Sequence, residues 1–297
     1  MAGKSKFIKA LNSINAYFDS ITQKIFTEAE LFGILEENRA KWDLAVSMFS
    51  SKFITELLLH TSLKEVVIHS EGQQSYTSEK ITRYTYGEVS VFEIALSIKK
   101  HTHLSHYSSV FLHGLSQQIP KTIYVTFEQS DKILKDGVLL QSSIDNAFSK
   151  AQREPGHYYS YLDYRIILLN SKFTRKAGII RLNSIFGNNL TITSLERTLI
   201  DITVRPAYSG GVNEVLKAYQ AAKDLLSVNK LTSILTKMNF IYPYHQAIGF
   251  YLQNAGYTSF QTNMLKTYGF SYDFYLTYNM IDIDYSKEWH LYYPKNF

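Results

Sequence analysis

Apolar side chains near the N-terminus are spaced as on the buried faces of helices. Between residues 4 and 24 they recur every three or four positions, the period of an amphipathic helix. Thr27-Glu-Ala-Glu30 has the pattern of a capping box, in which a hydroxyl and a carboxylate each accept a backbone N–H at a helix start. A third helix is predicted over residues 51–59, and its outward polar face carries Ser51, Lys52 and Thr55.

Two segments with strand-like composition follow these helices. Glu65–His69 and Lys80–Tyr86 are rich in β-branched and aromatic residues, and the polar residues 70–79 between them are rich in turn formers. The pattern therefore predicts a β-hairpin. Helix, helix and hairpin in this order are typical of a winged helix. We expect residues 1–88 to form an N-terminal arm and a winged-helix domain.

The remaining residues, 89–297, predict a larger domain of mixed composition. Capping boxes at Ser90–Glu93 and Thr193–Glu196 mark two helix starts. Further helices are predicted at His106–Leu115, Ser142–Gln152, Val212–Leu226, Lys230–Met238 and Tyr244–Gln253. Strands are predicted at Thr122–Phe127, Tyr164–Leu169, Ala177–Leu182 and in the tyrosine-rich tail. The expected fold class is α+β (mixed), with an N-terminal winged helix-turn-helix followed by a larger α/β domain.

Composition narrows the class of protein. A hydrophobic fraction of 45% supports a sizeable core, and a charged fraction of 19% is too low for disorder. The absence of cysteine excludes disulfides and thiolate chemistry and is typical of a reducing compartment. No apolar run reaches the roughly 18 residues of a membrane span, and the N-terminus lacks an apolar signal core. We expect a globular cytoplasmic protein with no membrane partner.

The charge pattern bears on nucleic-acid binding. The net charge of +5 favours contact with polyanions. Residues 1–100, however, hold 12 basic and 12 acidic side chains, so the basic excess lies outside the predicted winged helix. This distribution weighs against strong electrostatic DNA binding by that domain.

The motifs of nucleic-acid enzymes are missing. No glycine precedes a serine, so the Gly-Ser turn of a nucleotidyltransferase is absent, and Asp282-Ile-Asp284 is the one Asp-x-Asp. No lysine has an acidic residue two positions before it, as a common metal-dependent nuclease fold requires. We expect no catalytic site and no cofactor.

Four histidines have spacings that could suit a metal: His101, His103, His106 and His113. No acidic residue lies between Glu93 and Glu128 to complete such a site. We therefore interpret the four as helix-cap and surface histidines and expect no metal.

Several segments carry a resemblance to a known family. They are His113-Gly-Leu-Ser116, Pro120–Thr126 and Thr193-Ser-Leu-Glu-Arg-Thr-Leu-Ile-Asp201, followed by Arg205-Pro206 and Gly210-Gly211-Val-Asn-Glu-Val-Leu216. Through them the chain resembles AbiEi-type antitoxins of type IV toxin–antitoxin systems. The resemblance covers about Thr27 to Leu235, and Leu195–Asp201 is its most specific part.

The resemblance implies a transcriptional regulator and antitoxin of an abortive-infection system, with no catalysis of its own. The winged helix would bind operator DNA and repress the protein's own operon. The larger domain would be an α/β antitoxin domain that neutralises a cognate nucleotidyltransferase toxin. Whether neutralisation needs direct contact stays open.

The winged-helix hypothesis assigns six DNA-binding candidates. The helix at residues 51–59 would enter the major groove, where Ser51, Lys52 and Thr55 reach bases or phosphates. Lys64, Lys80 and Arg83 would flank the wing. A homodimer on DNA would concentrate these few cations. The alternative is that these side chains are solvated faces of a module kept for packing or protein contact.

Seven candidates lie in the second domain. Arg197 and Asp201 are four residues apart on one helix, and we expect a buried pair that fixes the helix to the sheet; direct contact with the toxin or RNA is the alternative. Arg205 ends that helix, where a cation suits its dipole. The basic segment with Lys172, Arg175 and Lys176, followed by Arg181, is the better candidate for contact with an acidic partner or nucleic acid. A solvated turn is the alternative.

Two rival classes stay open. A metal-dependent nucleic-acid enzyme would need distant acids such as Asp201, Asp282 and Asp284 to converge. The other rival is a protein-interaction module whose winged helix no longer binds DNA.

Overall fold

A computed structural model describes residues 5–72, 80–131 and 138–297, and it shows an α+β protein. The chain divides into two compact units. Unit 1 is Met1–Lys100 with His157–Tyr164, and unit 2 is His101–Gly156 with Arg165–Phe297. The sequence pattern placed a boundary after residue 88. In the structure the helix that follows this point belongs to unit 1, together with a strand from the middle of the chain.

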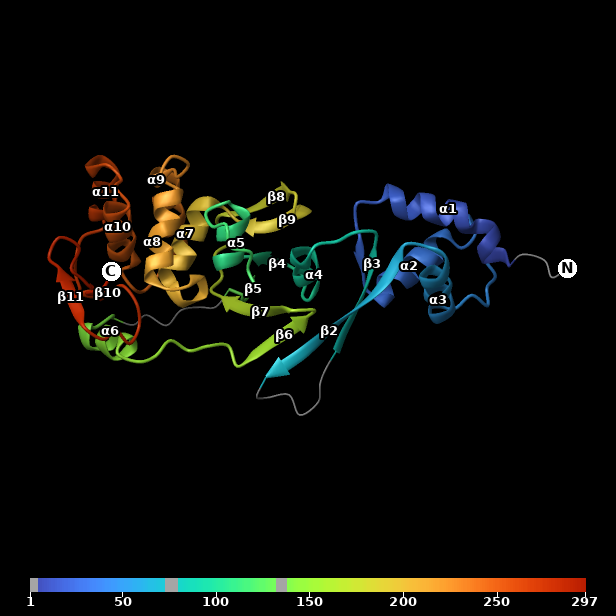
Figure 1. Ribbon diagram of the computed structural model, residues 1–297, viewed down its shortest axis with the longest axis horizontal. Coiled ribbons are helices and arrows are strands. Elements are labelled where there is room, and N and C mark those ends of the chain that lie inside the picture. Colours follow the sequence, from blue (N-terminus) through green and yellow to red (C-terminus); the bar gives the residue numbers. More distant parts are fainter. Residues whose placement is uncertain (1–4, 73–79, 132–137) are drawn as a thin grey trace. The chain divides into compact units, whose positions relative to one another are not determined.

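Unit 1 contains four helices and four strands within the described residues (Figure 1). In chain order they are α1 (Lys6–Ser20), β1 (Ile25–Phe26), α2 (Glu28–Asn38), α3 (Ser50–His60), β2 (Leu63–Gly72), β3 (Lys80–Tyr86), α4 (Val91–Ser97) and β6 (His157–Tyr161). The strands lie in the order β1-β3-β2-β6. All three pairings are antiparallel, with Val66 opposite Arg83 and Ser70 opposite Tyr159.

The predicted helices of unit 1 are present for the reasons that the sequence indicated. Thr27 and Glu30 form the capping box of α2, and Ser90 and Glu93 form that of α4. The apolar stripes of α1, α2 and α3 bury one cluster of side chains against β1 and β3, with Phe7, Phe18, Phe26, Phe53, Leu31 and Leu35 almost inaccessible. Because Phe53, Ile54 and Leu57 of α3 pack into this aromatic core, the opposite, polar face of α3 is exposed.

Unit 2 contains the remaining elements. Its helices are α5 (His106–Leu112), α6 (Gln141–Phe148), α7 (Leu195–Val204), η1 (Pro206–Ser209), α8 (Val212–Ala221), α9 (Val228–Met238), α10 (Tyr244–Asn254) and α11 (Ser259–Lys266). Its strands are β4 (Thr102–Leu104), β5 (Thr122–Glu128), β7 (Tyr164–Ser171), β8 (Ile179–Ser184), β9 (Gly187–Thr193), β10 (Phe274–Tyr275), β11 (Ile283–Ser286) and β12 (Leu291–Pro294).

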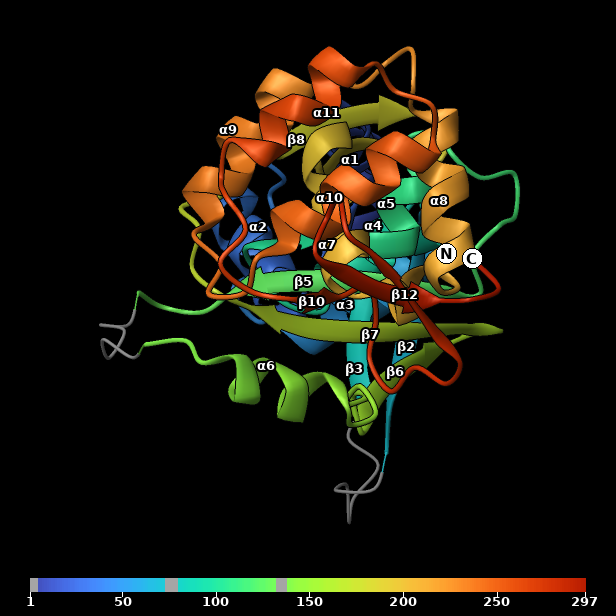
Figure 2. The ribbon, with the colours of Figure 1, turned by 90° about the vertical axis from the view of Figure 1, so that its left-hand side faces the viewer.

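The main sheet of unit 2 is mixed. Its strands follow the order β7-β5-β4-β9-β8, with parallel pairs β5/β7 and β4/β9 and antiparallel pairs β4/β5 and β8/β9. Helices α7 to α11 gather on one side of this sheet (Figure 2). Helix α7 contacts α5, α8, α9 and α10, so it forms the centre of the helical layer.

The tyrosine-rich tail forms a small sheet of its own, with β10 and β11 on either side of β12. Helix α6 packs on it through Phe148, whose ring stacks on Tyr275 and Tyr278 at centroid distances of 5.7 and 4.4 Å. The sequence pattern predicted strands in the tail, and these are present. It missed α11, β1, β4, β6 and β9, which are short or pair with residues distant in the chain.

One predicted helix start was wrong. Thr193 does not cap α7, because it is the last residue of β9 and its hydroxyl lies 2.7 Å from that of Thr198. Ser194 is the cap, and its hydroxyl accepts the N–H of Arg197 at 3.4 Å. Glu196 instead accepts a hydrogen bond from the Ser194 hydroxyl and forms an ion pair with Lys230. The strand pairing of Thr193, which is not local, overrides the local capping pattern.

Among the described residues, no helix is long and apolar enough to cross a membrane.

Candidate functional site

The outward face of α3 is the first candidate surface. Ser51, Lys52 and Thr55 are exposed, as the spacing predicted, because Phe53, Ile54 and Leu57 point into the core of unit 1. The Thr55 hydroxyl donates to the carbonyl of Ser51 at 2.9 Å, and the Lys52 ammonium is solvated. This face offers one cation and two small hydroxyls, a combination suited to a phosphate and to base edges.

The three wing candidates have different surroundings. Lys64 on β2 is exposed and lies 3.4 Å from the Glu88 carboxylate, and Lys80 is exposed at the start of β3. Arg83 is not a free wing cation. Its guanidinium donates to the carbonyls of Ser97 at 3.0 and 2.8 Å and of Ile98 at 3.3 Å, where it caps the C-terminal end of α4. The sequence predicted Arg83 as a cation flanking the wing. In the structure its guanidinium is instead held by the carbonyls at the end of α4.

A cavity of about 330 Å³ in unit 2 is the second candidate. It brings together four of the seven residues that the sequence singled out in this domain: Lys172, Arg197, Asp201 and Arg205. We call it the cationic cavity, because Arg153 adds a fourth cation and Asp201 is its one carboxylate. Leu169, Val204, Met238 and Phe240 supply apolar lining, and Asn170 and Tyr208 supply polar groups.

The predicted Arg197–Asp201 pair forms the inner wall of the cationic cavity. Arg197 Nε donates to Asp201 Oδ1 at 2.8 Å, and both side chains are nearly inaccessible, 2% and 9% exposed. Arg197 Nη1 donates to the Ala177 carbonyl at 2.8 Å, which ties α7 to the loop before β8. Close approach is possible because Gly178 has no side chain: a Cβ there would lie 2.7 Å from that of Arg197.

Lys172 and Arg205 come to the cationic cavity from different elements. Lys172 follows β7, and its ammonium donates to the Asn239 carbonyl at 2.6 Å, just after α9. Arg205 is the C-cap of α7, as predicted, and donates to the Tyr278 hydroxyl at 2.6 Å while lying over that ring. A hydrogen bond to one nitrogen leaves each head group with further N–H donors.

His106 lies at the base of the cationic cavity in an unfavourable conformation. Its φ of 49° falls in the left-handed region, and its ring packs edge-on against Tyr208 at 5.3 Å. Burial, with Arg197 and Arg205 nearby, lowers the pKa of His106 to about 3, so the ring is neutral. Strained backbone, a buried ion pair and a perturbed histidine around one cavity are features that cluster at functional sites.

The interpretation of the histidines as surface groups is corrected for two of them. His103 and His106 are both buried, 3% and 8% exposed. Burial, together with Arg197, lowers the pKa of His103 to about 4. His113 Nε2 donates to the Thr193 carbonyl oxygen at 2.8 Å. The sequence interpretation assigned these histidines to helix caps and the surface, but His103 and His106 are buried in unit 2.

The other basic candidates remain outside the cationic cavity. Arg175 and Lys176 are exposed in a tight turn with φ values of 54° and 56°, and the Lys176 N–H donates to Glu128. Arg181 on β8 is exposed and donates to the Asn189 carbonyl at 3.2 Å across the hairpin. These three form an exposed basic edge, suited to an acidic partner rather than to a small ligand.

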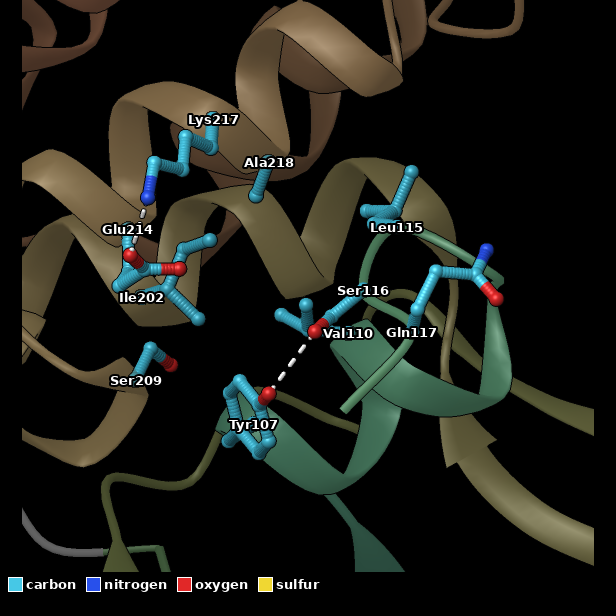
Figure 3. Close-up of a pocket in the computed structure, with 10 residues that line it drawn as sticks. All are labelled: Tyr107, Val110, Leu115, Ser116, Gln117, Ile202, Ser209, Glu214, Lys217 and Ala218. Atoms are coloured by element: carbon cyan, nitrogen blue, oxygen red, sulfur yellow. Dashed lines mark hydrogen bonds and ion pairs between the residues drawn. The ribbon is translucent and has the colours of Figure 1, made fainter. Parts of the chain in front are cut away.

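A second cavity, of about 220 Å³, lies among α5, α7, η1 and α8 (Figure 3). Its Tyr107 and Ser116 hydroxyls are 2.8 Å apart, and Lys217 pairs with Glu214 at 2.7 Å. The Ser209 hydroxyl is buried, with no hydrogen-bond partner among the described residues. The charged residues of this second cavity, Glu214 and Lys217, pair with each other, so the cavity has no preference for a charged ligand. The cationic cavity is therefore the better candidate for a ligand site.

Several members of the cationic cavity escaped the sequence analysis: Arg153, Asn170, Tyr208 and Phe240. None belongs to a motif: Asn170 lies in β7, Tyr208 in η1, and Arg153 and Phe240 in loops, so no local signal marks them. The acids of the rival metal-enzyme class do not converge. Within the described residues no group of three His, Asp or Glu side chains is arranged to hold a metal ion.

No family model and no curated protein matches the chain. Among solved structures, the crystal structure of the RV2827C protein from Mycobacterium tuberculosis is similar, with a TM-score of 0.58 and 12% sequence identity. The match covers 96% of this chain and 91% of that chain. At this identity the likeness concerns the fold alone.

Proposed function

We propose that the chain is a DNA-binding regulator of the AbiEi antitoxin type. Unit 1 would be a winged helix that binds operator DNA and represses the protein's own operon. Unit 2 would neutralise a cognate nucleotidyltransferase toxin. Both activities would take place in the cytoplasm, and neither needs catalysis by this chain.

The order of elements in unit 1 carries the proposal. Helix, strand, helix, helix and two strands follow one another as α1, β1, α2, α3, β2 and β3, and the short strand β1 pairs with β3 rather than with β2. This order matches the one expected of a winged helix and so supports the proposal, in which α3, the third helix, would be the recognition helix. The tip between β2 and β3, residues 73–79, lies outside the described residues.

The surface of α3 supports the assignment of its role. Its outward side chains Ser51, Lys52 and Thr55 are exposed, and the Thr55 hydroxyl bonds only within α3, whereas the apolar face of the same helix is buried. With Arg83 engaged by α4, Lys52, Lys64 and Lys80 are the cations left among the six candidates. Few phosphate contacts predict weak binding by a monomer and favour a homodimer on two half-sites.

Support for the antitoxin half comes from unit 2. Its most specific family-like segment, Leu195–Asp201, forms the central helix α7 and one wall of the cationic cavity. The exposed basic edge of Arg175, Lys176 and Arg181 offers a surface for an acidic partner.

DNA binding is tested with a labelled duplex of the protein's own upstream region and a scrambled duplex, across a salt series. We expect sequence-specific binding, which Lys52→Ala weakens on both duplexes alike while lowering the salt slope by about 1, because a phosphate contact is lost. Ser51→Ala with Thr55→Ala should instead reduce the preference for the upstream duplex.

Lys9→Ala is the matched control, since it removes one exposed cation from α1. It should change affinity less than Lys52→Ala. Equal binding to both duplexes by the unaltered protein would overturn autoregulation and favour a protein-interaction module.

Toxin neutralisation is tested by co-expression with the cognate nucleotidyltransferase, which the proposal expects to be encoded beside this chain. We expect growth to be restored by the full chain and also by a Ser51→Ala, Lys52→Ala, Thr55→Ala triple variant, because neutralisation is assigned to unit 2. Reporter repression by the same triple variant should be lost. Failure of the unaltered chain to restore growth, at levels shown by immunoblot, would contradict the antitoxin half.

A further inference from the structure

We infer that the cationic cavity of unit 2 binds a nucleoside monophosphate, with the phosphate held by the cations and the base against the apolar lining. This inference goes beyond the proposed function. It concerns a small ligand in unit 2, whereas DNA binding is assigned to α3 in unit 1.

Charge is the first argument. Arg153, Lys172, Arg197 and Arg205 face one cavity with Asp201 as the single carboxylate, a balance of three positive charges. His106 adds none, because its ring is neutral at physiological pH. Like charges that share a partly buried space repel one another, and a bound anion relieves that repulsion. The site therefore selects an anion and rejects cations.

Donor geometry favours phosphate. Arg197 already donates hydrogen bonds to Asp201 and to the Ala177 carbonyl. Its contribution to anion binding is therefore mainly its positive electrostatic potential, not a direct hydrogen bond to the ligand. Lys172 donates to the Asn239 carbonyl, and Arg205 donates through one nitrogen to the Tyr278 hydroxyl and the Val204 carbonyl, which restrains both head groups without using all their donors. Restrained cations of this kind lose little entropy when they bind phosphate oxygens.

The remaining lining argues against a bare phosphate ion. Leu169, Val204, Met238 and Phe240 give the cavity an apolar side, which an inorganic ion would leave unused. Asn170 carries both a donor and an acceptor, the combination that pairs with a base edge. About 330 Å³ is at the small end of the range for organic ligands, which suits one nucleotide with one phosphate better than a triphosphate.

Calorimetric titration of the full chain tests the inference. The probes are AMP, GMP, CMP and UMP, with adenosine and inorganic phosphate as separate arms. We expect saturable binding of at least one nucleotide, tighter than either separate arm. Lys172→Gln and Arg205→Gln should each weaken it roughly tenfold or more, because each removes a charged hydrogen bond.

Lys176→Gln is the matched control, since Lys176 lies in the same basic segment but is exposed and outside the cavity. It should change affinity by less than about twofold. Thermal unfolding of each variant shows that it is folded, and a rise in melting temperature with nucleotide gives a second readout.

Three results would overturn the inference. They are no saturable binding of any of the four nucleotides up to about 5 mM, equally tight binding by phosphate or adenosine alone, or nucleotide affinity unchanged in Lys172→Gln and Arg205→Gln. Each can occur while operator binding stays intact, so failure here is distinguishable from failure of the proposed function.

Discussion

Replacing Asp201 by alanine is expected to lower the free energy of unfolding by about 3–5 kcal/mol, the largest effect of a single polar substitution in unit 2. Arg197 is 2% exposed and pairs with Asp201 at 2.8 Å. Without the carboxylate, a guanidinium would remain buried near Lys172 and Arg205 with no opposite charge beside it. Urea unfolding followed by far-UV circular dichroism measures the change.

The exposed pair of Glu214 and Lys217 provides the comparison. It has a similar distance of 2.7 Å but exposed fractions of 42% and 67%, so Glu214→Ala should cost no more than about 1 kcal/mol. A double replacement, Arg197→Met with Asp201→Leu, should recover much of the loss by removing both charges. Equal costs for Asp201→Ala and Glu214→Ala would show that the buried pair does not stabilise α7.

Gly249→Ala is expected to destabilise the protein by roughly 2–3 kcal/mol or more, because the helix α10 packs directly on an indole ring. A Cβ at this position would lie 2.0 Å from the ring of Trp289, which is fully buried. The ring is also held by a hydrogen bond to Gln253, so it cannot move aside cheaply. Melting temperature and the near-UV signal of the indole should both report the change.

Gly33→Ala in α2 separates the steric effect from helix propensity. Nothing lies within 4 Å of a Cβ at Gly33, so alanine should stabilise the helix by about 0.5–1 kcal/mol. If Gly249→Ala were as harmless as Gly33→Ala, the packing of α10 against Trp289 described here would be incorrect.

Helix α7 carries charged side chains in its buried stretch, and their position next to the cationic cavity offers a reason for them. Helix α7 is buried along most of its length, yet it carries Glu196, Arg197 and Asp201 in that buried stretch. A purely structural helix would gain stability from apolar residues at such positions. Arg197 and Asp201 line the cationic cavity, which is consistent with a ligand site that the fold maintains at a cost in stability.

Local signals in the sequence determined much of the secondary structure. Helix starts at Thr27 and Ser90 were predictable because a capping box involves side chains and amides within four residues. The polar face of α3 and the Arg197–Asp201 pair were predictable because residues three and four apart share a helix face. These interactions need no knowledge of the rest of the fold.

Tertiary structure alone decided the features that join distant segments. Thr193 belongs to β9 because it pairs with Ile179 of β8. The Arg83 guanidinium is not free at the wing, because it donates to the Ser97 carbonyl at the end of α4. The cationic cavity combines Arg153, Lys172 and Arg205 with Phe240, which no local pattern connects. Periodicity and capping describe the chain within a few residues, whereas a binding cavity depends on which surfaces pack together, and that choice is made by the whole core.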